Sequence, residues 1–82
     1  MASKLNTVED VQQFFDQCVA FWVRQGDNRS VAVCKALWWD IVETSNAFDC
    51  WSPAKEEFVF KYRGYRRGDP EPEASRVESG NA

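Results

Sequence analysis

The chain has 82 residues, enough for one small domain, and a formal net charge of −3. Residues 1–68 carry nine Lys/Arg and nine Asp/Glu side chains, so the acidic excess lies in residues 69–82. A neutral body argues against broad electrostatic capture of nucleic acid or anionic membrane, and leaves that role to a local basic patch. Four Trp, six Phe and two Tyr are many aromatics for a small monomer to bury, which indicates an interface.

The cysteine content indicates the cellular compartment in which the protein occurs. There are three cysteines and no histidine, and an odd number of cysteines is a poor disulfide framework. We find no apolar segment typical of a signal peptide, and no apolar run of membrane-spanning length. The sequence therefore predicts a cytoplasmic protein with reduced thiols and no membrane association.

The first predicted helix runs from about Val8 to Gln25. Thr7 and Asp10 have the spacing of a capping box, with Asp in place of the usual Glu or Gln. Gly26 follows where a helix C-terminus favours positive φ. Apolar residues fall on one stripe at helical spacing. The stripe consists of Val8, Val11, Phe15, Cys18, Val19 and Trp22, with Phe14 and Phe21 just beside it.

A second helix is predicted from about Arg29 to Thr44, with Asp27 or Asn28 as its N-cap. The turn between the two helices is short, so we expect them to pack as an antiparallel hairpin. The apolar stripe of this helix consists of Val31, Cys34, Leu37, Trp38, Ile41 and Val42.

Residues 44–52 are predicted to form a loop, and Ser52-Pro53 to begin a third helix that ends between Gly64 and Gly68. Segment 58–65 fits two interpretations. Phe58, Phe60 and Tyr62 alternate as in a strand, but the segment also has helical spacing. We favour the helix, because a lone strand has no partner in this chain.

The predicted fold class is therefore all-α. We expect a small three-helix bundle, made of the hairpin and a shorter third helix, over residues 1–67. Residues 68–82 are polar and acidic, contain Pro70 and Pro72, and lack a periodic apolar set. They are predicted to be a disordered tail.

Catalytic and metal chemistry find little support in the sequence. Zinc sites need closely spaced Cys or His ligands, whereas Cys18, Cys34 and Cys50 are far apart. The first two fall on apolar stripes, as expected of core cysteines. Cys50 is the best candidate for a reactive thiol, but no histidine is present to activate it.

The carboxylate pairs and the glycines do not indicate a catalytic or phosphate-binding site. Glu9-Asp10 and Glu56-Glu57 occur at helix N-termini, where the helix dipole stabilises negative charge. The four glycines are scattered and form no phosphate-binding loop. We therefore expect no enzyme activity and no cofactor.

The segment 61–67 interleaves four cations with two tyrosines. Arginine can pair with phosphate and tyrosine can stack on bases, so the segment is a candidate contact for nucleic acid or for an acidic partner. The simpler interpretation is a solvated, basic helix C-terminus. The candidate residues are Lys61, Tyr62, Arg63, Tyr65, Arg66 and Arg67.

Trp39 is the first candidate for a protein contact. It follows Trp38, and adjacent helical residues point about 100° apart, so only one of the two can face the hairpin. Ala32 and Ala36 are expected beneath Trp39, which would make it an anchor on a ridge of small residues. Phe14 and Phe21 could form a second surface. Equally, the third helix or the loop aromatics could cover Trp39.

The sequence thus favours a small protein-binding module that inhibits or modulates a larger host or partner protein. Small phage or plasmid inhibitors have a similar size and composition, which is an analogy only. Self-association as a homodimer is compatible with the excess aromatics. The alternative is a small nucleic-acid-binding regulator that uses residues 61–67.

Overall fold

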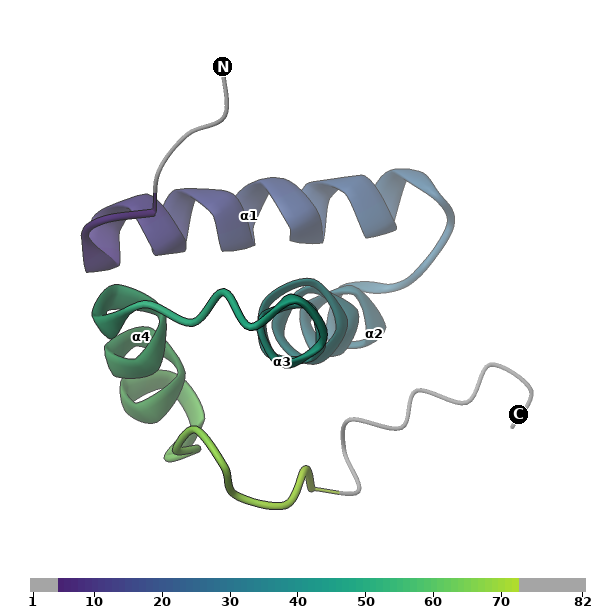
Figure 1. Ribbon diagram of the computed structural model, residues 1–82. Coiled ribbons are helices and arrows are strands. Elements are labelled where there is room, and N and C mark those ends of the chain that lie inside the picture. Colours follow the sequence, from purple (N-terminus) through teal and green to yellow (C-terminus); the bar gives the residue numbers. More distant parts are fainter. Residues whose placement is uncertain (1–4, 73–82) are drawn as a thin grey trace.

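The computed structural model describes residues 5–72, and all regular secondary structure in that range is helical. The first rod of the bundle is α1 (Val8–Arg24). The second is continuous and joins α2 (Arg29–Cys34), the π-helix η1 (Lys35–Glu43) and α3 (Thr44–Phe48). The third is α4 (Pro53–Arg63). The predicted all-α bundle of three helical rods is confirmed (Figure 1).

The ends of α1 follow from local hydrogen bonds. The Thr7 hydroxyl accepts a bond from the Asp10 amide at 3.0 Å, and the Asp10 carboxylate accepts one from the Thr7 amide at 3.2 Å. The predicted capping box is therefore present, with Asp in the reciprocal position. At the other end, Gly26 has φ +113°, which suits glycine. Three positions of the predicted stripe form the fully buried face: Val11, Phe15 and Val19.

The second rod begins where the sequence places it but ends later. The Asn28 side chain caps its N-terminus by accepting a bond from the Val31 amide at 3.0 Å. The helix continues past the predicted end at Thr44 and stops at Asp49, whose φ is +52°. The loop predicted for residues 44–52 is confined to residues 49–52, because the polar residues at its predicted start bond within the fold. The Thr44 hydroxyl donates to the Trp39 carbonyl at 2.9 Å, and Ser45 is fully buried.

The middle of this rod is a π-helix of nine residues, whose hydrogen bonds span five residues rather than four. The Thr44 amide, for example, bonds to the Trp39 carbonyl. This wider winding departs from the 100° step on which the sequence analysis relied. Five of the nine residues are buried: Ala36, Leu37, Trp38, Ile41 and Val42.

α1 packs across the second rod. Figure 1 shows α1 side-on while α2 and α3 are seen nearly end-on, so the two helices cross at a steep angle instead of packing antiparallel as expected. Ala32 and Ala36 are both fully buried in the core. Small side chains allow two helix backbones to approach closely, so these alanines suit the crossing.

α4 closes the bundle against the first half of α1. Ser52 caps it by accepting a bond from the Lys55 amide at 3.2 Å, with Pro53 in the first turn. Phe58 packs against Phe15 of α1 with ring centroids 5.5 Å apart. Gly64 ends the helix with φ +72°. The helical interpretation of segment 58–65 is thus confirmed as far as Arg63.

The predicted tail falls partly within the described residues. Residues 73–82 lie outside the range that the structure describes. Before them, the Asp69 amide bonds to the Arg66 carbonyl at 2.9 Å and closes a turn. Within residues 5–72, no helix is both long and apolar enough to cross a membrane.

Candidate functional site

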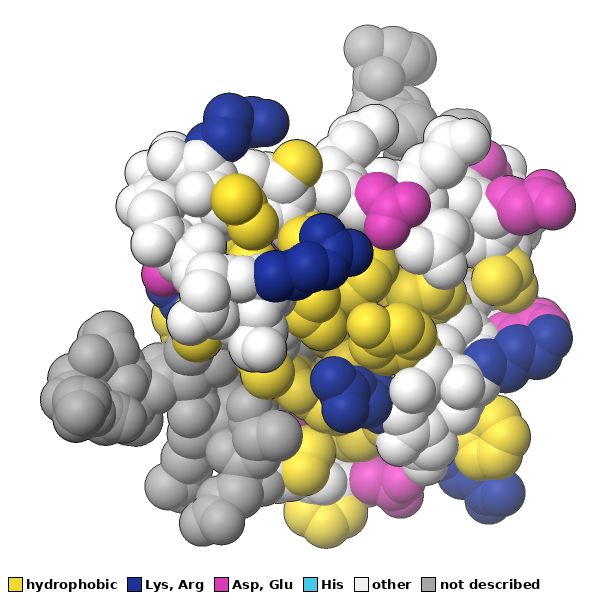
Figure 2. Space-filling model, turned by 180° about the vertical axis from the view of Figure 1, so that it is seen from behind, with side chains coloured by type: hydrophobic (Ala, Val, Ile, Leu, Met, Phe, Trp, Pro, Cys, Tyr) yellow, Lys and Arg dark blue, Asp and Glu magenta, His cyan; other side chains and the backbone are white. Residues whose placement is uncertain are grey.

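Some large hydrophobic side chains remain at the surface. Figure 2 shows one face of the molecule with hydrophobic side chains gathered near its middle and Lys or Arg side chains beside them. The most exposed large hydrophobics are Phe21, Val23, Phe48, Phe60 and Tyr62. Two of them contact other aromatic rings: Tyr62 meets Phe15 and Phe58 of the core, and Phe21 meets Trp22, which is only partly buried.

We call Phe21, Trp22 and Trp39 the aromatic row. The last turns of α1 supply Phe21 and Trp22, and η1 supplies Trp39. The rings of Phe21 and Trp22 meet edge to face at 5.0 Å, and those of Trp22 and Trp39 do so at 5.6 Å. Edge-to-face contact is the favoured geometry of aromatic pairs. Phe21 is 45% exposed and the two tryptophans are half-buried, so the row reaches the surface.

Two charged side chains, Asp40 and Lys35, contact the indole rings of the aromatic row. The Trp22 indole N–H donates to Asp40 Oδ2 at 2.9 Å. The Lys35 ammonium lies 4.6 Å from the Trp22 ring centroid and 5.2 Å from that of Trp39, within cation–π range of both. Lys35 also pairs with Asp27 at 2.8 Å, and its side chain is only 13% exposed. The two indoles are therefore held in a fixed geometry.

A cysteine lies beneath this frame. Burial, followed by the charge of Asp40 and a hydrogen bond to it, raises the pKa of Cys18 to about 12. The thiol therefore stays protonated at neutral pH and can donate to Asp40, which also accepts from Trp22. Cys18 is half-buried, close to the core position that its stripe predicts.

The structure separates the residues proposed for a protein contact. Trp39 and Phe21 join through Trp22 in the aromatic row. Trp39 is covered in part by Trp22 of α1. Phe14 is half-buried and lines a different, small hollow. The expected surface ridge of Ala32 and Ala36 is wrong, because both are fully buried in the core.

Three residues of the aromatic row and its charged surroundings were not predicted from the sequence. Trp22 was assigned to the core stripe, and Lys35 and Asp40 were given no role. Their contacts join α1 to the second rod, and helical periodicity within one helix does not report such contacts. The spacing of Lys35 and Trp39, four residues apart, was the one local indication that they share a helix face.

Ion pairs occupy part of the basic segment 61–67. Lys61 pairs with Glu57 at 3.0 Å, one helical turn away. Arg67 lies 3.3 Å from Asp49 and 3.4 Å from Glu56, so it connects α4 to the preceding loop. These two cations are therefore partly neutralised within the chain.

The remaining members of the segment do not form one surface. Arg63 lies over the Tyr62 ring and Arg66 over the Phe60 ring, at 5.3 and 5.2 Å. Tyr62 is 42% exposed, whereas Tyr65 is only 5% exposed. The expectation that Tyr65 stacks on bases is wrong in this conformation, because the left-handed residue Gly64 turns the chain back and directs Tyr65 into the bundle.

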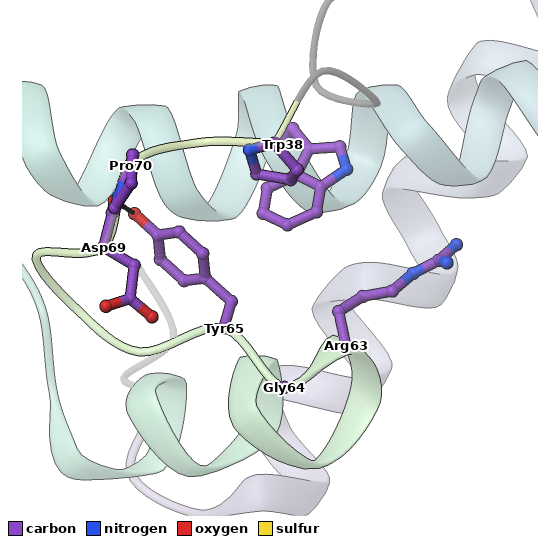
Figure 3. A pocket seen from close by; sticks show the side chains of 7 residues that line it. Trp38, Arg63, Gly64, Tyr65, Asp69 and Pro70 are labelled. Carbon is purple, nitrogen blue, oxygen red and sulfur yellow. Dashed lines mark hydrogen bonds between the residues drawn. The ribbon is translucent and has the colours of Figure 1, made fainter.

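Tyr65 borders a hollow of about 350 Å³ between α4, η1 and residues 69–72, which follow α4 (Figure 3). Its ring meets Trp38 edge to face at 5.5 Å and stacks on Trp51 at 6.5 Å. Figure 3 shows Tyr65 reaching toward Asp69, while Arg63 points away from both. The hollow was not foreseen, because the residues that close it were assigned to the tail.

Potential reactive and ligating groups are few in the described part. Among residues 5–72, no group of three or more His, Cys, Asp or Glu side chains is placed to hold a metal ion. Cys50 is exposed, and the Lys55 ammonium lies 3.4 Å from its sulfur. The same ammonium bonds to the Cys50 carbonyl at 2.9 Å and the Ser45 hydroxyl at 3.2 Å, so it fastens the loop to α4.

No protein family, curated protein or solved structure was found to match this chain. The aromatic row and the hollow over Trp38 are two features of the described residues that can support a function.

Proposed function

We propose that this protein is a binding module that attaches to a larger partner protein through the aromatic row and modulates it. The supporting observation is the row itself: three contacting rings that reach the surface, of which the two tryptophans also pack against the buried core. Trp, Tyr and Arg dominate the contacts that carry binding energy in protein interfaces. Apolar surface that remains after the core is closed marks such interfaces.

The frame around the row favours tight binding. Side chains that are already ordered lose little conformational entropy when a partner docks. Trp22 is held by Asp40, and both indoles lie against the Lys35 ammonium. Phe21 is the more exposed end of the row and would enter a pocket on the partner.

The test compares two exposed phenylalanines. Tagged wild-type protein and the variants Phe21→Ser and Phe48→Ser are used to capture proteins from a nuclease-treated lysate of the native host. Phe48 is 75% exposed and belongs to no aromatic pair among the described residues, so it is the matched control. We expect one protein to be retained by wild type and Phe48→Ser but lost with Phe21→Ser.

The retained protein is then purified and its affinity measured by calorimetry. We expect Phe21→Ser to weaken binding at least tenfold, or about 1.4 kcal/mol, while Phe48→Ser stays within twofold. Equal binding of both variants would overturn the assignment to this row. Capture seen only in a parallel lysate without nuclease would instead favour the basic segment, and a captured second copy of the chain would indicate a homodimer.

A further inference from the structure

Two arginines from different helices line one open hollow at the surface. Arg29 is the first residue of α2, and Arg63 is the last residue of α4. The hollow has a volume of about 410 Å³, and its other lining residues are Ser30, Val33 and Cys34 of α2. We call it the arginine hollow. Figure 3 shows the Arg63 side chain pointing away from Tyr65, and thus away from the hollow over Trp38.

The positive charge of the arginine hollow is not balanced by an acidic neighbour. No Asp or Glu of the described residues lines it. Within residues 5–72, neither Arg29 nor Arg63 belongs to an ion pair, whereas Lys35, Lys61 and Arg67 all do. Like charges repel at short range, so an anion that binds between the two guanidinium groups would relieve this repulsion.

A second hollow of similar size provides a comparison. It measures about 460 Å³ and lies at α4 and the residues that follow it. Its two arginines are accompanied by two glutamates, and Arg67 lies 3.4 Å from Glu56. The charges of this second hollow therefore cancel within the chain, whereas those of the arginine hollow leave a formal excess of two positive charges. Its lining residues are Pro53, Glu56, Glu57, Phe60, Arg66 and Arg67.

One of the two arginines rests on an ordered surface. The Arg63 guanidinium lies over the Tyr62 ring, 5.3 Å from its centroid. That ring is itself held by Phe15 at 5.2 Å and by Phe58 at 5.6 Å, both of which belong to the core. A side chain that is ordered in advance loses less conformational entropy when a ligand binds. Arg63 is therefore suited to binding an anion rather than only to remaining in solvent.

The charge excess and the lining indicate the chemistry of the ligand. Guanidinium groups bind phosphate oxygens in a bidentate manner, and a phosphate monoester carries a charge of about −1.5 to −2 at pH 7. A carboxylate or a phosphodiester carries only one negative charge. The volume is that of a pocket for a ligand with an apolar part as well as a charged group. Val33 and Cys34 are half-buried and offer such a part a contact surface.

We propose that the arginine hollow binds a phosphotyrosine side chain of a partner protein. Arg29 and Arg63 pair with the phosphate, and the Ser30 hydroxyl donates to one of its oxygens. The aromatic ring of the ligand lies against Val33 and Cys34. This site is separate from the aromatic row, and the proposal does not depend on the function proposed for that row.

The experiment uses the full chain, labelled with ¹⁵N, and the capped peptide acetyl-Gly-phosphotyrosine-Gly-amide. The same peptide without phosphate and inorganic phosphate are the two comparison ligands. Binding is followed by NMR from the backbone N–H signals of Ser30, Val33 and Cys34, with those of Glu57 and Phe60 in the second hollow as internal controls. We expect the phosphopeptide to shift the first set selectively. It should bind about tenfold more tightly than either comparison ligand.

Three variants complete the test. Arg29→Gln and Arg63→Gln each remove one exposed cation, and each should weaken binding of the phosphopeptide about tenfold, because a charge-assisted bond to phosphate is lost. Arg66→Gln removes an exposed cation of the second hollow and is the matched control, with an expected change of less than about twofold. Circular dichroism checks that all three variants keep the helical content of the wild type.

Two results would overturn the proposal. The first is a phosphopeptide that binds no more tightly than inorganic phosphate, which would indicate an adventitious ion only. The second is an affinity that responds equally to all three variants, or to none of them, because the two arginines of the hollow would then have no specific role in binding.

Discussion

Two adjacent tryptophans of η1 have opposite environments. Trp38 is 2% exposed and meets the ring of Tyr65 edge to face. Trp39 is half-buried and meets Trp22 with nearly the same ring geometry, but beside the charged frame of Lys35. The contact type is the same on both sides, whereas the burial differs. Ring contacts alone therefore do not distinguish a residue that stabilises the fold from one that is available to a partner.

The largest effect should come from truncating the buried ring. We expect Trp38→Ala to lower the free energy of unfolding by about 3–5 kcal/mol, because it removes a buried aromatic and leaves a cavity. Trp39→Ala should cost less, about 1–2 kcal/mol, since that ring keeps part of its contact with water. Urea denaturation followed by circular dichroism measures both values. An equal loss of unfolding free energy in the two variants would show that Trp38 and Trp39 contribute equally to the stability of the fold.

An intermediate effect is expected from the charged frame. Lys35→Met keeps most of the side-chain length but removes the ion pair with Asp27 and the cation over both indoles. We expect a loss of about 1–2 kcal/mol in unfolding free energy. The matched control is Lys61→Met, whose exposed helical pair with Glu57 should contribute about 0.3–0.5 kcal/mol. Similar losses in the two variants would show that the frame does not stabilise the row.

The smallest effect concerns two carboxylates, Glu43 of η1 and Glu71, which follows α4. The pKa of Glu43 is raised from 4.5 by desolvation and by Glu71, so the folded state binds this proton more tightly than the unfolded chain. The stabilising contribution is complete below pH 4.5 and is lost as the pH rises through the raised pKa. Glu71→Gln should therefore lower the pKa of Glu43, measured by NMR titration, and raise the melting temperature slightly at pH 7. An unchanged pKa would show that desolvation alone causes the shift.

Local sequence features predicted the ends of most helices. The capping residues Thr7, Asn28 and Ser52 act through neighbours three positions away, and Gly64 acts through its own backbone. Such interactions depend on nearby residues and can be found without knowing the fold. The late end of the second rod was missed because Thr44 and its polar neighbours bond to the helix rather than to water.

The candidate sites were predicted less well than the helices. Phe21 and Trp39 were identified as surface aromatics, but the ring that joins them, Trp22, was placed in the core. Its position depends on the steep crossing of α1 over the second rod and on the side chain of Asp40. The turn that follows α4 was missed for a related reason. Asp69 is held through its backbone and a local turn, and no apolar periodicity marks that contact.

The π-helix has a consequence for how this chain tolerates changes in length. Each of its hydrogen bonds spans one residue more than a bond in an α-helix. Deleting a single residue from η1 would let the rod close into ordinary α-helical winding, in which each residue turns by about 100°. The nine residues of the wider winding turn through nearly the same total angle as one residue fewer in an α-helix, so α2 and α3 would keep their relative orientation. The second rod should therefore tolerate the loss of one residue from η1 better than α1, an ordinary α-helix, tolerates the same loss.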